Sequence, residues 1–331
     1  MRFIKFFCVL LLVVAVFGFS IISYAEAGKW RAGTVANKGT LDFDTFQKWC
    51  DLVGNNTNGK ISIDPFPSEQ LGPYRDMFDN TVRGTQQAGL LPISPEFDQR
   101  LQAVYTVYLA ESWEEGRQIF QKDGWMFQLL APVFADLGLK PLGFYFLGLD
   151  GLGSTKGPVV LPEDLKKENV KVRTWCAADR LFFEEIGAQT VDISFSELFT
   201  SLQTGVAHAQ DNAPLVTYDH LREVTKYYTD TNHIFETLVL VLNKDLWDNQ
   251  TPEIQKAIQD AADEALSWGN AQAEETSEAY LKKMEESGIH VTRLTREQRA
   301  QWKDFGLSSW KKFVDIIGKK DMDIIAKNVG R

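Results

Sequence analysis

The sequence predicts an α/β fold built from two packed lobes, and three observations support this prediction. Short apolar segments of strand type alternate with amphipathic helical segments along most of the chain. About 300 residues remain once a leader is set aside, a length that suits two domains or one large one. No internal repeat or low-complexity linker interrupts the pattern, so the lobes must be joined by crossings of the chain itself.

The predicted elements follow one another in a regular order. Apolar alternation, or a short apolar run closed by glycine or proline, predicts strands at 29–35, 59–67, 86–94, 139–148, 170–175, 189–194, just before 210, and 236–244. Apolar residues at helical spacing predict helices at 43–55, 74–84, between about 111 and 137, 161–169, 180–187, 195–205, and 251 to about 287. Glycines directly after several helices, and prolines such as Pro162 and Pro252 in first turns, support these limits.

Residues 1–25 have the features of a secretory signal peptide. Arg2 and Lys5 precede an apolar run from residue 6 to about residue 19, and residues 23–25 suit signal peptidase. The apolar run is short for a membrane span, which favours cleavage and export over the alternative, an uncleaved anchor. The mature protein is therefore expected to be soluble and exported.

The chain is acidic, with a formal net charge of -10. Loss of Arg2 and Lys5 with the leader would change this to -12. Such a charge makes nucleic acid and anionic membranes poor partners, and any anionic ligand must be captured by local positive groups. Cys50 and Cys176 would both remain after cleavage, and whether they pair is left open, because a disulfide has strict geometric requirements.

The glycine-rich segment 148–157, "GLDGLGSTKG", invites comparison with phosphate-binding loops. The order Ser154-Thr155-Lys156 does not fit the P-loop motif, and the spacing of a dinucleotide-binding loop is also absent. We expect this segment to be a flexible crossing between the lobes, with glycines for tight turns.

No catalytic motif is apparent elsewhere in the sequence. There is no G-x-S-x-G, and no pair among the four histidines has the H-E-x-x-H spacing. A secreted hydrolase or isomerase therefore remains only the enzyme-class alternative, and we expect no catalytic residues.

A strand with an arginine at its centre, "VKVRTW" (170–175), is a candidate binding element. Alternation places Arg173 and Trp175 on the same face. The guanidinium would either hold an anionic ligand or pair with a protein carboxylate such as Asp192 or Glu197. Likewise, Gln210-Asp211-Asn212 at a predicted strand end would either contact a small molecule or cap a loop.

The segment 171–214 resembles the signature of the DctP family, the periplasmic solute-binding proteins of TRAP (tripartite ATP-independent periplasmic) transporters. The matching motifs, in chain order, are Lys171-Val172-Arg173, Gly187-Ala188, Phe195-Ser196-Glu197, Leu202-Gln203-Thr204-Gly205 and Gln210-Asp211-Asn212-Ala213-Pro214. Further matches are "GKISIDPFPSEQLG" (59–72), "LPEDLK" (161–166) and "TNHIFETLVLVLNKDLWD" (231–248). The resemblance spans essentially the whole mature chain.

This resemblance implies a two-lobed periplasmic-binding-protein fold with hinge crossings and a long bracing helix. Lobe I would comprise 26–149 plus about 239–278, and lobe II about 150–238 plus 279–331. It further implies that Arg173 forms a bidentate salt bridge with a ligand carboxylate. Asn212 would add a hydrogen bond, while Trp175 and Phe195 would form pocket walls. Asn37 is a weaker ligand-binding candidate from the other lobe.

The sequence also departs from the family pattern at two acids. Asp150 stands where many members carry a second arginine, and Glu236 where an uncharged ligand contact is common. The favoured ligand is therefore a zwitterion or amine-bearing acid, with Arg173 on its carboxylate and Asp150 or Glu236 on its cation. The alternative is a hydroxy- or keto-acid bound through Ca²⁺. Asp150 would also be consistent with an outward-facing turn.

The resemblance implies a periplasmic protein that binds a small carboxylate-containing ligand and delivers it to the small and large membrane permease subunits. A sensory ligand-binding subunit is the alternative within the binding class. No cofactor is expected apart from the Ca²⁺ of that second hypothesis. The oligomeric state is left open, because the long helix would either brace a monomer or pack in part against a second copy.

Overall fold

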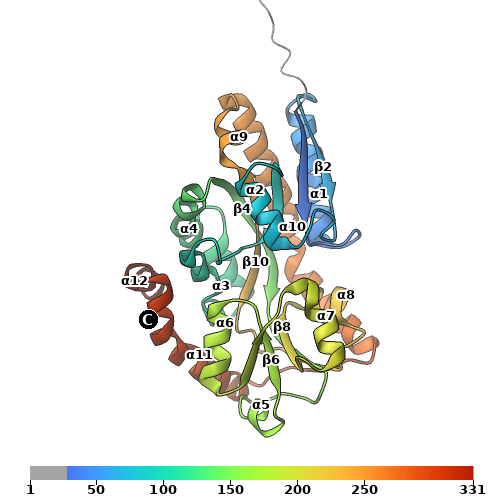
Figure 1. The fold of residues 1–331 in the computed structure, drawn as a ribbon, viewed down its shortest axis with the longest axis vertical. Helices are drawn as coiled ribbons and strands as arrows, with labels where there is room; N and C mark the ends of the chain where they lie inside the picture. The colour runs from blue at the N-terminus through green and yellow to red at the C-terminus, as the bar shows by residue number, and fades with distance from the viewer. Residues whose placement is uncertain (1–27, 331) are drawn as a thin grey trace, which may run out of the picture.

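The computed structural model describes residues 28–330, so the expected signal peptide lies outside the described residues. These residues form two β-sheets with helices packed around both (Figure 1), which confirms the predicted α/β class. None of the helices in this range is both long enough and apolar enough to span a bilayer.

The first sheet contains the N-terminal strands and has the order β2-β1-β3-β10-β4. Its strands are β2 (Ile61–Phe66), β1 (Gly28–Thr34), β3 (Ala88–Pro92), β10 (Phe235–Asn243) and β4 (Leu139–Leu149). β1 runs parallel to β2 and β3, whereas β10 is antiparallel to β3 and β4. Every residue of β10 is buried, which explains the apolar run at 238–242.

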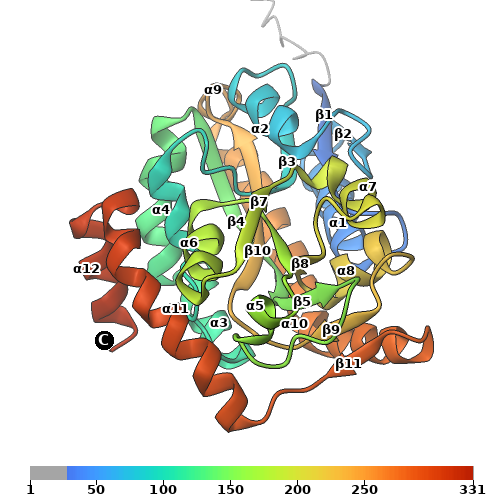
Figure 2. The same cartoon turned by 60° about the horizontal axis from the view of Figure 1, so that its bottom comes forward.

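The second sheet has the order β11-β9-β5-β8-β6-β7 (Figure 2). Its strands are β11 (His290–Thr292), β9 (Tyr227–Thr229), β5 (Gly151–Ser154), β8 (Ala209–Asn212), β6 (Lys171–Thr174) and β7 (Gln189–Asp192). β6 is parallel to both β7 and β8, and β5 is antiparallel to β8 and β9. The lobe boundaries expected from the sequence describe units that would move relative to each other, so they stay a prediction.

Two short crossings connect the sheets and are hydrogen-bonded to each other. Asp150 is the single residue between β4 and β5, and residues 230–234 join β9 to β10. The backbone N–H of Asp150 donates to the carbonyl oxygen of Ile234 at 2.8 Å. Asp150 therefore lies at the junction of the two halves.

Helices cover both sheets. They are α1 (Leu41–Asn56), α2 (Tyr74–Val82), α3 (Trp113–Phe120), α4 (Trp125–Asp136), α5 (Asp164–Lys167), α6 (Ala177–Ile186), α7 (Phe195–Thr204), α8 (Pro214–Leu221), α9 (Lys244–Asp248), α10 (Pro252–Glu286), α11 (Arg296–Ile317) and α12 (Lys319–Asn328), with a 3₁₀ helix at Gln99–Tyr105. The 35-residue α10 packs against α1 and β4 of the first half and against α8 and β11 of the second. Thr251 caps its first turn and Pro252 follows, so its start agrees with the prediction.

The segment 148–157 crosses between the two sheets, as expected, but it is not a flexible stretch of tight turns. Residues Gly151–Ser154 form the buried strand β5 inside the second sheet. A Cβ on Gly151 would lie only 2.6 Å from the carbonyl oxygen of Thr229 and would also collide with the Tyr228 ring. Close strand packing, rather than turn formation, explains this glycine.

Cys50, in α1, and Cys176, at the start of α6, are both free. No disulfide therefore joins these two residues in this structure, and the burial of Cys50 suits a small apolar side chain.

Candidate ligand-binding site

A cavity of about 40 Å³ lies between the two sheets. It is lined by Val35, Tyr74, Pro92, Leu147, Arg173, Trp175, Phe195, Asn212, Val216, Glu236 and Leu238. Ligand pockets usually measure roughly 300–1,000 Å³, so the cavity in this structure is small for a bound solute.

Arg173, near the end of β6, supplies positive charge to the cavity. Its side chain is 2% exposed, and its Nε donates to the carbonyl oxygen of Ile193 at 3.0 Å. Within residues 28–330 no carboxylate forms an ion pair with it, and Glu197 instead accepts from the Ser194 hydroxyl at 2.7 Å. The guanidinium therefore retains N–H groups for a ligand, and the alternative pairing with Asp192 or Glu197 is not observed.

Asn212, at the end of β8, lies beside Arg173 on the cavity wall. Its side-chain amide donates to the Gln210 side chain, and its backbone oxygen accepts from the Tyr228 hydroxyl at 3.0 Å. These contacts fix the strand end from both sides. Asn212 is thus held rigidly at the cavity, and its hydrogen bond to a ligand stays a prediction.

Two aromatic residues form walls of the cavity. The Trp175 ring meets Tyr105 edge-on with centroids 4.4 Å apart, and Cζ of Arg173 lies 5.9 Å from the centroid of the Trp175 ring. The indole N–H is buried and has no hydrogen-bond partner in the described part of the chain. Trp175 therefore offers a donor as well as an apolar surface, a role the sequence did not suggest. Phe195 begins α7 and packs edge-on against His220.

Asn37 does not line the cavity in this structure. Its side-chain oxygen accepts from the Ser68 hydroxyl at 2.7 Å, and its amide lies 3.4 Å from Nε2 of His220 on α8. Asn37 thus connects the first half of the molecule to the second. Its role as a ligand contact stays a prediction.

Tyr74, which the sequence did not single out, also lines the cavity from the start of α2. Its hydroxyl oxygen accepts from Nε of Arg75 at 3.1 Å. Aromatic residues at a cavity wall and in a core look alike in a sequence, so no local signal marked it.

Asp150 and Glu236 lie next to each other, and their acidic side chains are opposite in charge to Arg173, which lines the same cavity. Glu236 lines the cavity and is 8% exposed, whereas Asp150 is fully buried next to it. The outward-facing alternative for Asp150 is therefore wrong. Burial raises the pKa of Asp150 well above its usual value, and the charges of Glu236 and Asp211 raise it further. Burial also raises the pKa of Glu236 to about 7, against the opposing effect of its neighbour Asp150.

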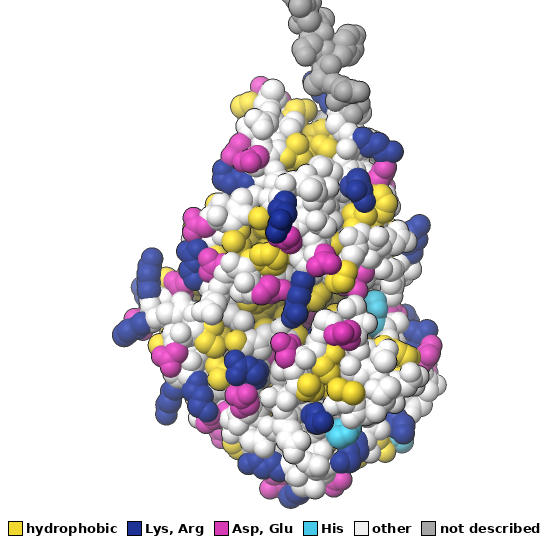
Figure 3. Space-filling view, in the orientation of Figure 1, with side chains coloured by type: hydrophobic (Ala, Val, Ile, Leu, Met, Phe, Trp, Pro, Cys, Tyr) yellow, Lys and Arg dark blue, Asp and Glu magenta, His cyan; other side chains and the backbone are white. Residues whose placement is uncertain are grey.

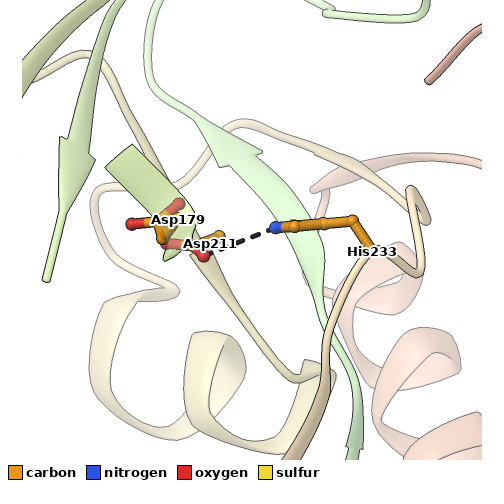
Figure 4. Close-up of side chains that lie close together, drawn as sticks. All are labelled: Asp179, Asp211 and His233. Atoms are coloured by element: carbon orange, nitrogen blue, oxygen red, sulfur yellow. Dashed lines mark hydrogen bonds and ion pairs between the residues drawn. The ribbon is translucent and has the colours of Figure 1, made fainter. Parts of the chain in front are cut away.

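A second buried group, formed by Asp179, Asp211 and His233, lies deeper in the molecule (Figure 4). Nε2 of His233 is 3.4 Å from Asp211 Oδ2, and its Nδ1 is 2.8 Å from the Thr231 hydroxyl. Burial and the charge of Asp211 raise the pKa of Asp179. One donor atom from each of the three residues lies within 4.8 Å of the others.

Two α/β halves, a shared bracing helix and a small cavity with a buried, unpaired arginine define a solute-binding protein. Residues 32–315 match the model of the family described as bacterial extracellular solute-binding protein, family 7 (DctP), and the chain belongs to this family. It is a solute-binding protein of the TRAP type.

Known relatives match over nearly their full length. A C4-dicarboxylate-binding periplasmic protein of Shewanella loihica is 28% identical over 94% of this chain and 93% of its own. An ectoine/5-hydroxyectoine-binding periplasmic protein of Ruegeria pomeroyi is 27% identical over 91% of this chain and 89% of its own. The crystal structure of a TRAP periplasmic solute-binding protein from Shewanella oneidensis with bound succinate has 24% identity and a TM-score of 0.83, covering 92% of this chain and 99% of its own.

Proposed function

We propose that this protein captures a small zwitterionic or amine-bearing carboxylic acid in the periplasm and delivers it to a small and a large membrane permease subunit. The carboxylate would bind Arg173 and be oriented by Asn212. The cationic group would face Glu236, with Asp150 behind it. Trp175 and Phe195 would exclude water from the bound solute.

One observation carries this proposal: a buried glutamate and a buried arginine, which forms no ion pair with residues 28–330, line the same small cavity. A buried charge is stable only when an opposite charge and hydrogen bonds compensate it. A ligand with a carboxylate at one end and a cation at the other would provide this for both residues. A simple dianion would satisfy Arg173 but would be repelled by Glu236.

The ligands of the relatives are compatible with a carboxylate on Arg173. Succinate and C4-dicarboxylates carry two carboxylates, while ectoine carries one carboxylate and one cationic ring. Ectoine thus represents the charge pattern proposed for this protein, and it serves as a probe.

A metal-bridged hydroxy- or keto-acid is the second candidate ligand. Both side-chain oxygens of Asp150 and Oε2 of Glu236 lack hydrogen-bond partners among the described residues. Oxygen atoms of this kind are the ligands that Ca²⁺ prefers. In that case, binding of a hydroxy-acid such as D-glucuronate would be lost after dialysis against a chelator and restored by calcium.

The first experiment is to denature gently purified protein and to identify the released small molecule by mass spectrometry, with metal content measured on the same sample. An amino-containing acid would support the proposal. A plain organic acid with stoichiometric calcium would favour the second candidate, and a plain diacid without metal would contradict both.

The matching binding experiment is calorimetry with ectoine, succinate and D-glucuronate on the wild-type protein and on Arg173→Lys. Lysine keeps the charge but loses the planar fork that matches two carboxylate oxygens, so we expect at least about a tenfold loss in affinity. Arg180→Lys, on the exposed face of α6, is the control and should bind as the wild type does. Equal affinities of all three proteins would show that Arg173 does not hold the carboxylate.

A further inference from the structure

Four buried carboxyl groups form one cluster that extends from the cavity into the interior. The buried acid cluster consists of Asp150, Asp179, Asp211 and Glu236, each less than 10% exposed. The basic groups closest to it are Arg173 and His233. Burying one ion costs several kcal/mol unless it is compensated, so four ionised carboxylates cannot coexist beside one permanent cation. The cluster must therefore hold protons near neutral pH.

Within this cluster, Glu236 lines the cavity and Asp150 lies directly behind it. The backbone bond from Asp150 to Ile234 places Asp150 beside the start of β10, where Glu236 is the second residue, and the two side chains influence each other's pKa. Both oxygens of Asp150 and one of Glu236 have no other partner in residues 28–330. A buried acceptor without a partner is destabilising, and one proton shared between the two carboxyl groups joins one oxygen of each in a hydrogen bond.

The other charged and titratable groups around this pair act in both directions. Arg173 on β6 and the backbone N–H of Ala213 favour ionised Glu236, whereas Asp211 on β8 disfavours it. Asp211 and Asp179 both oppose ionisation of Asp150. Around these groups, the Tyr228 hydroxyl is occupied by the Asn212 carbonyl, and His233 faces Asp211. No further cation reaches Asp150 from the described elements, so its own proton neutralises it.

We propose that the proton shared by Asp150 and Glu236 stands in for the cationic group of the ligand, and that an entering ammonium or amidinium group displaces it. The O–H bond of Asp150 breaks, the proton passes to solvent, and the N–H groups of the ligand then donate to the carboxylates. The charge of the site is conserved in this exchange. The inference rests on the proposed function, because it needs a cation opposite the carboxylate bound by Arg173.

This exchange makes Asp150 a positioning residue that determines specificity without lining the cavity. A cation can replace the proton at no change in charge, whereas a dianion would require the cluster to take up a further proton. Affinity for a zwitterion should therefore fall as the pH is lowered, because protons compete for the same place. Affinity for a dianion such as succinate should change in the opposite direction.

The test is calorimetry of ectoine binding at pH 7 in phosphate and in Tris, whose ionisation enthalpies differ. The dependence of the observed heat on the buffer gives the number of protons exchanged. We expect the wild type to release close to one proton per ectoine bound. In Asp150→Asn the amide donates permanently to Glu236, so proton release should disappear and ectoine affinity should fall at least about tenfold. Asp304→Asn, an exposed substitution on α11, is the control and should behave as the wild type.

A ligand-free measurement separates this inference from the proposed function. Infrared difference spectroscopy at pH 7 should show the C=O stretch of a protonated carboxyl group that disappears in Asp150→Asn and in Glu236→Gln. If ectoine binds without proton release, the exchange is overturned while the ligand class stands. If ectoine does not bind in the calorimetry, the proposed ligand class and the displacement of a proton by a cation both fail. The shared proton is judged separately: an infrared carboxyl band that is lost in both variants still supports it. Absence of that band in the wild type overturns the shared proton itself. If circular dichroism shows that Asp150→Asn does not fold, proton release and ectoine affinity are compared between the wild type and Glu236→Gln instead.

Discussion

The buried acids of this protein differ in which groups donate hydrogen bonds to their carboxyl oxygens. Asp42, in the first turn of α1, is fully buried, yet it accepts hydrogen bonds from the Thr40 hydroxyl and from the backbone N–H of Phe43 at 3.0 Å. Asp150 finds no such donor among the described residues and lies next to a second carboxyl group, that of Glu236. A buried acid with local hydrogen-bond donors can stabilise the first turn of a helix, whereas one without such donors can interact with a ligand.

Asp42 leads to a prediction about stability and pH. Burial raises its pKa to about 6 from an ordinary value of 3.8. Between these values the folded state binds more protons than the unfolded state, so the free energy of unfolding decreases as the pH rises through this range. Asp42→Asn removes the titration and keeps a side-chain oxygen as acceptor. We compare the free energy of unfolding of the variant with that of the wild type at each pH. The variant minus wild-type difference should be more favourable to the variant at pH 7.5 than at pH 5 by about 1–1.5 kcal/mol.

Urea denaturation at the two pH values measures this difference. Asp44→Asn changes an exposed acid in the same helical turn and should show no comparable pH dependence. A pH dependence shared equally by both variants would mean that Asp42 titrates as it does in the unfolded chain.

Alternation along the strand predicted that Arg173 and Trp175 share a face, whereas Phe195 and Glu236 were singled out by the family resemblance and Asn212 by its place at a strand end. All five line one cavity, and their contacts with a ligand stay predictions. Tyr74 and the apolar wall could not be predicted, since their contacts come from segments distant in sequence. Nor could a local pattern decide whether Asp150 faces inward, because this depends on how the crossings pair.

Among the elements, strand β5 shows why glycines can mislead. A run of four glycines in ten residues suggested a flexible loop, yet β5 lies between β8 and β9 with all four residues buried. Gly151 leaves room for the Tyr228 ring, whose hydroxyl in turn binds the end of β8. The reason for this glycine is a tertiary contact that no local pattern contains. For the same reason, α11 and α12 were not predicted, although α11 packs against α6 (Figure 2).

Substitution of this glycine should destabilise the fold. A methyl group on Gly151 would collide with Tyr228 and approach the Thr229 carbonyl, and neither backbone can move freely inside the sheet. Gly151→Ala should therefore lower the free energy of unfolding by about 1–3 kcal/mol. Gly157→Ala is the matched control, because no other group lies within 4 Å of the place that its methyl group would take. Equal unfolding midpoints in urea for the two variants would contradict close packing at β5.

The whole molecule consists of two halves that share one brace and two short crossings. Helix α10 contacts both halves, and the crossings are tied together by the bond between Asp150 and Ile234. On the face shown in Figure 3, basic and acidic side chains are interspersed. If the two halves move relative to each other, the motion would occur at the crossings and would break the contacts that close the cavity.

The contact between Asn37 and His220 is one of these closing contacts. Its loss should favour separation of the halves, so the dissociation rate of a bound solute should rise about 2–10-fold in Asn37→Ala, with little change in the association rate. His220→Ala should have a similar effect, and the double variant should be no worse than either single one, because both remove the same contact. Asn55→Ala, at an exposed position of α1, is the control.

Stopped-flow fluorescence of the cavity tryptophan would measure these rates with each solute that binds. A closing contact acts equally on every solute, since it does not touch them, whereas a direct contact of Asn37 with the ligand would change the rates for some solutes and not for others. Fully additive effects in the double variant, or effects that depend on the solute, would therefore restore Asn37 as a ligand-binding residue. Equal, non-additive effects would place it in the closure of the two halves, where it reaches the solute only through His220 and Phe195.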